Sequence, residues 1–457
     1  MSLGDYKRTT LFALVLLTIT CTSFLLLQAP TRQYFTQQQS NTHSKGLFLS
    51  RLSQYLFPDQ WDGGGARWNG WITHNQQALQ TLFTCLENEP GFCPRNRTSV
   101  VILASTHLVG DQEGYNGGED VWARSTIEAL DRFGYTYLYS PHFDGTLREA
   151  MALYRMFPNL VKMVISEVAE ANKCFYDARC ILSERNPYGI PAWKLFAWQF
   201  WEEAGTPLGH KWTLNPEDYT LEHPWTVPNT YLGYSIEPWC SKIPFIPHEQ
   251  RAKPGIAYLY GKKTGYFKGS GHAWNAEIYR EAAKESGAHF VVSAGDPGEA
   301  MPDDFPTDIV ESLGNRVEQH EFYTRLSGAA VVIGAGWPRT SPTFYDALCF
   351  GTPVINPIRE WNASDPTNRD YWVAQHGTMK ELDPPFVYNV FQGDKQGFID
   401  AVKKALENPI DRFILDRMRM SAVEERLAGI LETDWRGEGI KLLEERKAHG
   451  GGPLFSI

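Results

Sequence analysis

The residues best suited to chemistry on a ligand lie in the stretch 330–357, AVVIGAGWPRTSPTFYDALCFGTPVINP. An apolar run ends at Gly334 and Gly336, and after a short loop Ser341-Pro342 reads as an N-cap followed by proline at the first helical position. The glycines let a ligand approach the backbone. Free N–H groups at a helix start favour a phosphate. The pattern of strand, glycine loop, helix and strand indicates half of a nucleotide-binding α/β unit.

Three further side chains in this stretch are predicted to touch the ligand. Trp337 lies in the loop, Thr343 begins the helix, and Asp346 lies one turn beyond Pro342, within reach of a ribose hydroxyl. The alternative is that Gly-x-Gly only closes a strand-to-helix turn and that Asp346 faces water. A dinucleotide oxidoreductase is disfavoured because a full Gly-x-Gly-x-x-Gly is absent, position 339 being Arg.

Composition sets the class of protein. The chain has 457 residues, enough for two or three domains, and 42% of them are hydrophobic, as in a globular protein. The formal net charge is -10, which disfavours nucleic acid as a partner because no broad basic surface can neutralise phosphates. The composition therefore indicates a globular protein rather than a disordered or nucleic-acid-binding one.

The N-terminal region predicts the compartment. Lys7 and Arg8 precede the apolar run 11–27, which we interpret as an uncleaved signal anchor with a cytosolic tail at residues 1–10. A cleaved signal peptide is the alternative. Asn-x-Ser/Thr sequons at Asn96 and Asn362 agree with luminal exposure. We therefore expect a single-pass type II membrane protein whose catalytic part is luminal.

Six cysteines lie beyond the anchor, and an oxidising lumen allows disulfides. Short spacing predicts the pairs Cys85–Cys93 and Cys174–Cys180. We interpret Cys349, inside the helix that follows Ser341, as a buried thiol.

Alternating apolar runs and helical patterns predict two α/β domains with parallel sheets. The expected organisation is a stem at 28–65, an acceptor-side Rossmann-like domain at 66–252, a nucleotide-sugar-binding Rossmann-like domain at 253–409, and a C-terminal helix and tail at 410–457. Within these domains, Trp193–Glu203 is predicted to be a helix, Gly205–Glu237 a connecting loop and Val317–His320 a strand. Ile410–Ala428 is predicted to be a long helix that crosses back onto the first domain.

Two such domains behind a luminal anchor suggest a GT-B-type glycosyltransferase, with Rossmann-like domains facing each other across a cleft. The motif KWTLNP at 211–216, the segment 228–234 with Glu237, and Tyr260-Gly261-Lys262 resemble the N-acetylglucosaminyltransferase V family, glycosyltransferase family 18. The stretch 334–357 is also similar to that family. The likeness covers roughly residues 205–400, with a weaker match at Gly117-Gly118-Glu119.

The resemblance implies a Golgi enzyme that transfers N-acetylglucosamine from UDP-GlcNAc to a mannose of an N-glycan, in β-1,6 linkage, with inversion and without a metal. The absence of Asp-x-Asp from the chain agrees with metal independence. Glu119 is then the general base, with Asp111, Glu113 and Asp120 as the competing carboxylates. Alternatively, Glu119 only favours the helix N-terminus electrostatically.

The diphosphate side of the site is expected to use basic residues and helix starts. Gly261 and Lys262 form a glycine loop with Lys263, and Arg339 and Arg359 are further candidate cations, although each could be a solvated surface charge. Trp212 and Asn215 are predicted on the acceptor side, with packing as the alternative role for Trp212.

The family usually has Glu where Asp346 stands, and the loop 337–342 differs from the family's loop. The stem is short, and the extra N-terminal luminal domain of animal members is not expected here. Two other functions stay open, namely a GT-B transferase that uses another sugar nucleotide and a non-catalytic luminal glycan-binding protein. The expected partners are a nucleotide-sugar donor, a glycoprotein glycan and, through the anchor, the membrane.

Overall fold

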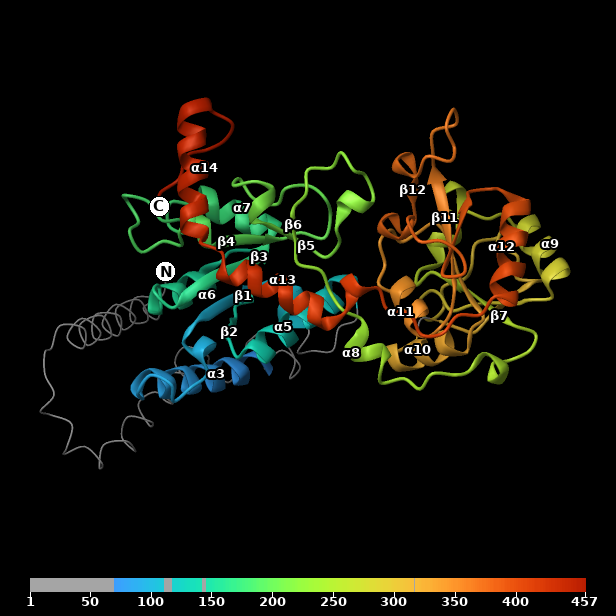
Figure 1. Ribbon diagram of the computed structural model, residues 1–457, viewed down its shortest axis with the longest axis horizontal. Helices are drawn as coiled ribbons and strands as arrows, with labels where there is room; N and C mark the ends of the chain where they lie inside the picture. The colour runs from blue at the N-terminus through green and yellow to red at the C-terminus, as the bar shows by residue number, and fades with distance from the viewer. Residues whose placement is uncertain (1–69, 111–116, 142–144, 316) are drawn as a thin grey trace, which may run out of the picture.

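The computed structural model describes residues 70–110, 117–141, 145–315 and 317–457. The predicted tail, anchor and stem lie outside this range, as do Asp111 and Glu113. Figure 1 shows two α/β bodies side by side, each built around one sheet. The predicted α/β class with two sheets of parallel type is confirmed.

The first sheet is parallel throughout, in the order β2-β1-β3-β4-β5-β6. Its strands are β1 (Val100–Ala104), β2 (Thr136–Tyr139), β3 (Val161–Glu167), β4 (Leu195–Trp198), β5 (Thr213–Asn215) and β6 (Thr230–Tyr231). The accompanying helices are α3 (Gly70–Glu87), α4 (Thr106–Gly110), α5 (Gly118–Phe133), α6 (Arg148–Met156) and α7 (Val168–Tyr176). From β1, strand β2 is added on one side and β3 to β6 on the other, so the strand order switches between β1 and β3, the position at which doubly wound sheets bind ligands.

The second sheet runs β12-β11-β10-β7-β8-β9, with β13 also paired to β11. Its strands are β7 (Ile256–Tyr260), β8 (His289–Val292), β9 (Val310–Ser312), β10 (Val331–Gly334), β11 (Val354–Glu360), β12 (Val373–Ala374) and β13 (Val387–Phe391), and β12 alone among these is antiparallel. Its helices are α9 (Ala276–Ser286), α10 (Gln319–Gly328), α11 (Thr343–Cys349) and α12 (Lys395–Glu407). Strands β8 and β9 lie on one side of β7, and β10 and β11 on the other, so the strand order switches between β7 and β10, as in dinucleotide-binding sheets.

The chain returns to the first body after the second sheet. Helix α13 (Met420–Glu432) lies along α5 (Figure 1), and α14 (Trp435–His449) follows it. Arg132 on α5 donates to Glu424 on α13 over 2.6 Å. The predicted return is therefore confirmed, but the helix begins at Met420 rather than Ile410, after an extended segment and a single 3-10 turn.

The close cysteine pairs are confirmed as disulfides Cys85–Cys93 and Cys174–Cys180. The interpretation of Cys349 as a thiol is wrong, because it is bonded to Cys240 across 109 residues. Cys240 ends the short helix α8 (Glu237–Cys240), on the segment that joins the two bodies, and Cys349 ends α11.

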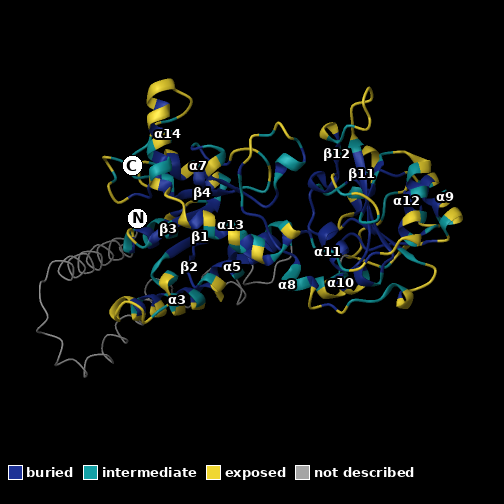
Figure 2. Cartoon of the chain, in the orientation of Figure 1, coloured by how far each residue is buried: buried dark blue, intermediate teal, exposed yellow. Residues whose placement is uncertain are grey.

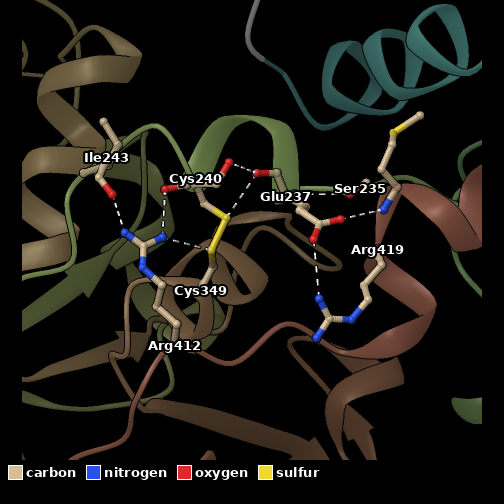
Figure 3. Close-up of a disulfide and its surroundings, with 9 residues drawn as sticks. Ser235, Glu237, Cys240, Ile243, Cys349, Arg412 and Arg419 are labelled. Carbon is tan, nitrogen blue, oxygen red and sulfur yellow. Dashed lines mark hydrogen bonds and ion pairs between the residues drawn. A yellow bond between two sulfur atoms is a disulfide. The ribbon is translucent and has the colours of Figure 1, made fainter. Parts of the chain in front are cut away.

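Figure 3 shows this disulfide and its neighbours. Arg412 donates to the carbonyl oxygens of Cys240, over 3.1 Å, and of Ile243. On the same segment, a carboxylate oxygen of Glu237 accepts a hydrogen bond from the backbone N–H of Met420 over 3.0 Å, at the start of α13. The outgoing and returning connections are therefore held together beside α11.

Three segment assignments are wrong. Trp193–Glu203 is not helical but contains β4, whose four residues are all buried. A parallel strand covered on both faces is apolar at every position, so its pattern does not alternate and resembles a helix. The loop assigned to Gly205–Glu237 contributes β5 and β6 to the first sheet, and Val317–His320 is not a strand, since β9 lies at Val310–Ser312 and α10 begins at Gln319.

Burial follows the sheets, whose strands are dark blue in Figure 2, while outer helices such as α9 and α12 show exposed faces. Tyr345, Leu348 and Phe350, on and just after α11, belong to the same apolar cluster as the first sheet. This packing joins the two bodies through α11. Among the described residues, no helix combines the length and the apolar character needed to span a membrane.

Candidate active site

A cavity of about 990 Å³ opens between the two bodies at the carboxyl ends of their strands. Its wall is formed by the start of α5 and the loop after β4 on the first body, and by the loops after β7, β8 and β10, helix α10 and the first turn of α11 on the second. The polar and aromatic side chains on this wall include Glu119, Trp201, Tyr260, Lys262, Tyr323, Trp337, Arg339, Ser341, Thr343 and Asp346. Glycine-rich loops of the second sheet and an acidic helix start of the first sheet therefore face one space.

A smaller cavity of about 260 Å³ lies beside it on the first body. Its wall includes His107 after β1, Glu167 at the end of β3 and Gln199 after β4. These residues lie at the carboxyl ends of β1, β3 and β4, next to the point between β1 and β3 where the strand order switches and where such sheets bind ligands. Glu119, Phe200 and Trp201 line both cavities.

Glu119 lies in the first turn of α5 and is partly buried. Its neighbour Asp120 is fully engaged, since one carboxylate oxygen accepts from the backbone N–H of Gly117 over 2.6 Å and the other lies 2.8 Å from Nδ1 of His107. Asp120 therefore caps the helix, which leaves Glu119 as the carboxylate of this turn that faces both cavities.

The wall of the smaller cavity is polar. Ser105 donates a hydrogen bond to Glu167, and the same hydroxyl oxygen accepts from the backbone N–H of His107 over 3.2 Å. The hydrogen bond to Asp120 raises the pKa of His107, with smaller contributions from the charges of Glu167 and Glu119. Two carboxylates and an imidazole that is more easily protonated thus surround a space suited to a hydroxylated ligand.

Hydrogen bonds hold the loop that precedes α11 on the wall of the larger cavity. Ser341 Oγ lies 2.6 Å from the hydroxyl of Tyr260 and accepts from the backbone N–H of Thr343 over 3.4 Å. Thr340 adopts a positive φ of 50°, which is uncommon outside glycine, and its N–H bonds to the carbonyl of Gln375. The predicted N-cap is wrong, because Pro342 and not Ser341 immediately precedes the helix and no side chain caps it.

Asp346 is buried, with 3% of its surface exposed, so the alternative in which it faces water is wrong. Burial raises its pKa to about 8, against the opposing effects of the Tyr323 hydroxyl and the charge of Arg124. Its Oδ1 has no hydrogen-bond partner among the described residues. A buried carboxyl on the cavity wall with one unsatisfied oxygen is suited to contact a hydroxylated ligand.

The buried carboxylate of Glu217 supports α11 from behind. It accepts hydrogen bonds from Tyr234, Tyr345 and Thr378 at 2.9, 2.9 and 3.0 Å. Burial raises the pKa of Glu217, and the cation of Arg417 acts against that effect. Tyr345 lies on α11 while Glu217 follows β5, so the network joins the helix beside the cavity to the first body.

Gly334 and Gly336 do not line the cavity. Gly336 has a positive φ of 105°, and a Cβ there would lie 2.5 Å from the carbonyl oxygen of Gly271. Its N–H donates to the Gln375 side chain over 2.8 Å. The close approach that these glycines permit is thus to the protein's own backbone and Gln375 rather than to a ligand.

Trp212 and Asn215 also lie away from both cavities. Trp212 is buried and donates to the carbonyl of Trp193 over 3.2 Å. It therefore has the packing role that the sequence analysis gave as its alternative. Asn215 donates to the carbonyl oxygens of Gln199 and Trp201, at 2.6 and 2.7 Å. Asn215 therefore shapes the loop that lines both cavities without touching their contents, and the predicted direct contacts are wrong.

The candidate cations differ in their surroundings. Lys262 is exposed and lines the larger cavity with Gly261, whereas Lys263 is exposed but not on its wall. Arg339 lines the cavity but is paired with Glu222 over 2.9 Å. Arg359 does not line the cavity, and its guanidinium lies over the Trp337 ring at 4.5 Å.

His107, Glu167, Phe200 and Trp201 are among the cavity side chains that the sequence did not predict. Each follows or ends a strand of the first sheet, at the edge where ligands bind. Because residues 193–203 were predicted to be a helix, Phe200 and Trp201 were not recognised as residues that follow a strand end. No group of three or more His, Cys, Asp or Glu side chains suited to a metal ion occurs in the part of the chain that the structure describes.

A family model described as glycosyltransferase family 18 matches residues 162–434. The chain is 21% identical over 245 residues to alpha-1,6-mannosylglycoprotein 6-beta-N-acetylglucosaminyltransferase B of Mus musculus, covering 50% of this chain and 30% of the relative. It is also 21% identical over 239 residues to enzyme A of Homo sapiens, with the same coverage. The chain thus matches about a third of the length of these relatives.

Solved structures give weaker likenesses. An O-GlcNAc transferase mutant of Thermobaculum terrenum has a TM-score of 0.36 at 12% identity, covering 89% of this chain and 77% of that one. The calicheamicin glycosyltransferase CalG4 has a TM-score of 0.30 at 12% identity, covering 77% and 98%.

Proposed function

The chain belongs to glycosyltransferase family 18, and from this membership we propose that it transfers N-acetylglucosamine from UDP-GlcNAc to a mannose of an N-glycan. A β-1,6 linkage, inversion at the sugar C1 and independence of metal ions are part of the proposal. The names of the curated relatives support the transferred sugar, the mannosylglycoprotein acceptor and the linkage. The proposed setting is the Golgi lumen, with the protein anchored as a type II membrane protein.

One observation carries the mechanism: Glu119 lies on the wall of both cavities. We place the nucleotide sugar in the larger cavity and the acceptor sugar in the smaller one. A carboxylate at their junction can accept the proton of the acceptor hydroxyl while the hydroxyl oxygen attacks C1 of the donor sugar. The C1–O bond to the diphosphate breaks on the opposite side, and UDP departs with inversion at C1.

The leaving diphosphate requires positive charge and hydrogen-bond donors. Lys262 supplies the charge, with the Ser341 and Thr343 hydroxyls on the same wall. Helix α11 has only seven residues, so we assign it the smaller electrostatic part. Asp346, with its unsatisfied oxygen, is proposed to bind the ribose hydroxyls.

The test is acceptor-dependent UDP release by the protein with UDP-GlcNAc, a mannose-terminated N-glycan and EDTA. We expect release in the wild type and a loss of about 10²- to 10⁴-fold in Glu119→Gln. The control Glu128→Gln changes a carboxylate farther along α5, which pairs with Arg132 and lines neither cavity. It should keep full activity.

Other results would contradict parts of the proposal. Release with another sugar nucleotide but not with UDP-GlcNAc would refute the donor assignment and keep the transferase. Glycan binding without turnover of any donor, unchanged in Glu119→Gln, would indicate a non-catalytic glycan-binding protein. Release that EDTA abolishes would refute metal independence.

A further inference from the structure

Three ring side chains, His223, Trp225 and Tyr371, form an exposed aromatic patch outside both cavities. The rings of His223 and Trp225 stack with centroids 5.2 Å apart, and those of Trp225 and Tyr371 are 5.4 Å apart. Trp225 is 59% exposed and Tyr371 is 48% exposed. Exposed aromatic clusters of this kind mark binding surfaces more often than isolated apolar side chains do.

The aromatic patch is assembled from two distant segments. His223 and Trp225 precede β6 in the first body, while Tyr371 precedes β12 in the second. Nδ1 of His223 lies 3.2 Å from the carbonyl oxygen of Asp370. The buried ammonium of Lys380 donates to the carbonyl oxygens of Glu222 and Asp370. These contacts hold the two segments together, so the patch is formed before any ligand arrives.

The patch is connected to the catalytic cavity by direct contacts. Glu222, which precedes His223 in the chain, is 2% exposed and pairs with Arg339 over 2.9 Å. Arg339 lines the larger cavity, and its guanidinium lies 5.7 Å from the Trp201 ring. Trp201 in turn lines both cavities and is 39% exposed. The residue next to the aromatic patch thus contacts a side chain of the cavity wall, which places the patch one residue along the chain from that contact.

We propose that the aromatic patch binds sugar residues of the acceptor glycan beyond the one that enters the smaller cavity. This inference rests on the proposed function. The apolar C–H face of a pyranose ring can lie flat on an aromatic ring, while its hydroxyl groups stay in water or bond to polar ring atoms. His223 and Tyr371 supply such atoms, and Trp225 supplies the largest flat surface.

The chain offers a matched control. Tyr188 is 73% exposed and lies in the loop between α7 and β4. It lines neither cavity, and its side chain stacks on no other ring among the described residues. Replacing it removes an aromatic ring that is more exposed than those of Trp225 and Tyr371, without touching the patch.

The experiment compares acceptor KM values for a simple mannoside and for an extended N-glycan, using wild type, Trp225→Ala, Tyr371→Ala and Tyr188→Ala. We expect Trp225→Ala to raise KM for the extended glycan by about five- to ten-fold, the size expected for one lost aromatic stacking contact. KM for the mannoside and for UDP-GlcNAc should not change. Tyr188→Ala should match the wild type throughout.

An equal rise in KM for both acceptors, or no change for the extended glycan, would overturn the inference. If the wild type transfers no sugar, the proposed function fails, and titration of the protein with the free N-glycan, followed by tryptophan fluorescence, still tests the patch. Weaker binding in Trp225→Ala but not in Tyr188→Ala supports it. If Trp225→Ala instead weakens binding to a glycoprotein equally before and after its glycans are removed, the patch binds protein and the inference is wrong.

Discussion

Replacing Asp346 with Asn should stabilise the protein in a pH-dependent manner. The carboxyl is buried on the wall of the larger cavity, with one oxygen unsatisfied, and its pKa is about 8 instead of 3.8. The folded protein therefore keeps this proton up to a pH of about 8, whereas the unfolded chain releases it near 3.8. The free energy contributed by this proton is fully present below pH 3.8 and is lost as the pH rises to about 8.

The size of the effect follows from about 1.36 kcal/mol per pH unit between the two pKa values. Relative to a side chain that never ionises, Asp346 lowers the free energy of unfolding by about 4 kcal/mol at pH 7 and by about 2 kcal/mol at pH 5. Asn has nearly the same shape, can donate a hydrogen bond as the protonated carboxyl does, and has no charge to lose. Asp346→Asn should therefore be more stable than the wild type by about these amounts.

Urea denaturation of both proteins at pH 4, 5, 7 and 8.5 measures the difference directly. It should be close to zero at pH 4, grow through pH 7 and stop growing above about pH 8. Asp416→Asn is the control, because that side chain is 99% exposed and its replacement should give no such slope. A difference that does not depend on pH, or an Asp346→Asn variant that is less stable than the wild type at pH 7, would refute the argument from burial.

Three other perturbations have defined outcomes. Replacing both Cys240 and Cys349 with Ser opens a loop of 109 residues and should lower the free energy of unfolding by up to about 5 kcal/mol, measured in urea; a loss below about 1 kcal/mol would show that the surrounding contacts suffice. Arg417→Met removes the hydrogen bonds to the Tyr345 hydroxyl and the Thr378 carbonyl together with the nearby charge that favours the Glu217 carboxylate, and it should lower the free energy of unfolding by about 1–3 kcal/mol, part of which Arg417→Lys should recover; equal stabilities would contradict this supporting role. Lys262→Met should slow transfer by about 10²-fold while thermal unfolding stays unchanged, and a normal rate would remove it from diphosphate binding.

Much of the scaffold can be read from neighbouring residues. The strands Val100–Ala104 and Ile256–Tyr260 are continuous apolar runs bounded by polar or glycine residues, and they form as predicted. Cys85 on α3 and Cys174 on α7 each bond to a cysteine just beyond the end of their helix, eight and six residues further along, so spacing alone predicts both pairs. These features depend on interactions over a few residues, which the sequence displays directly.

The candidate site depends on which distant segments meet. Glu119 becomes the carboxylate shared by two cavities only because the start of α5 faces the loops of the second sheet. Asp346 is buried because Tyr323 on α10 and the first body close over α11, although its place in the helix is equally compatible with solvent. The Cys240–Cys349 bond and the Glu217 network likewise join residues more than 100 positions apart. Local patterns show which face of an element is apolar, but the choice of neighbouring element follows from packing of the whole chain, and that packing sets the burial and charge of the site.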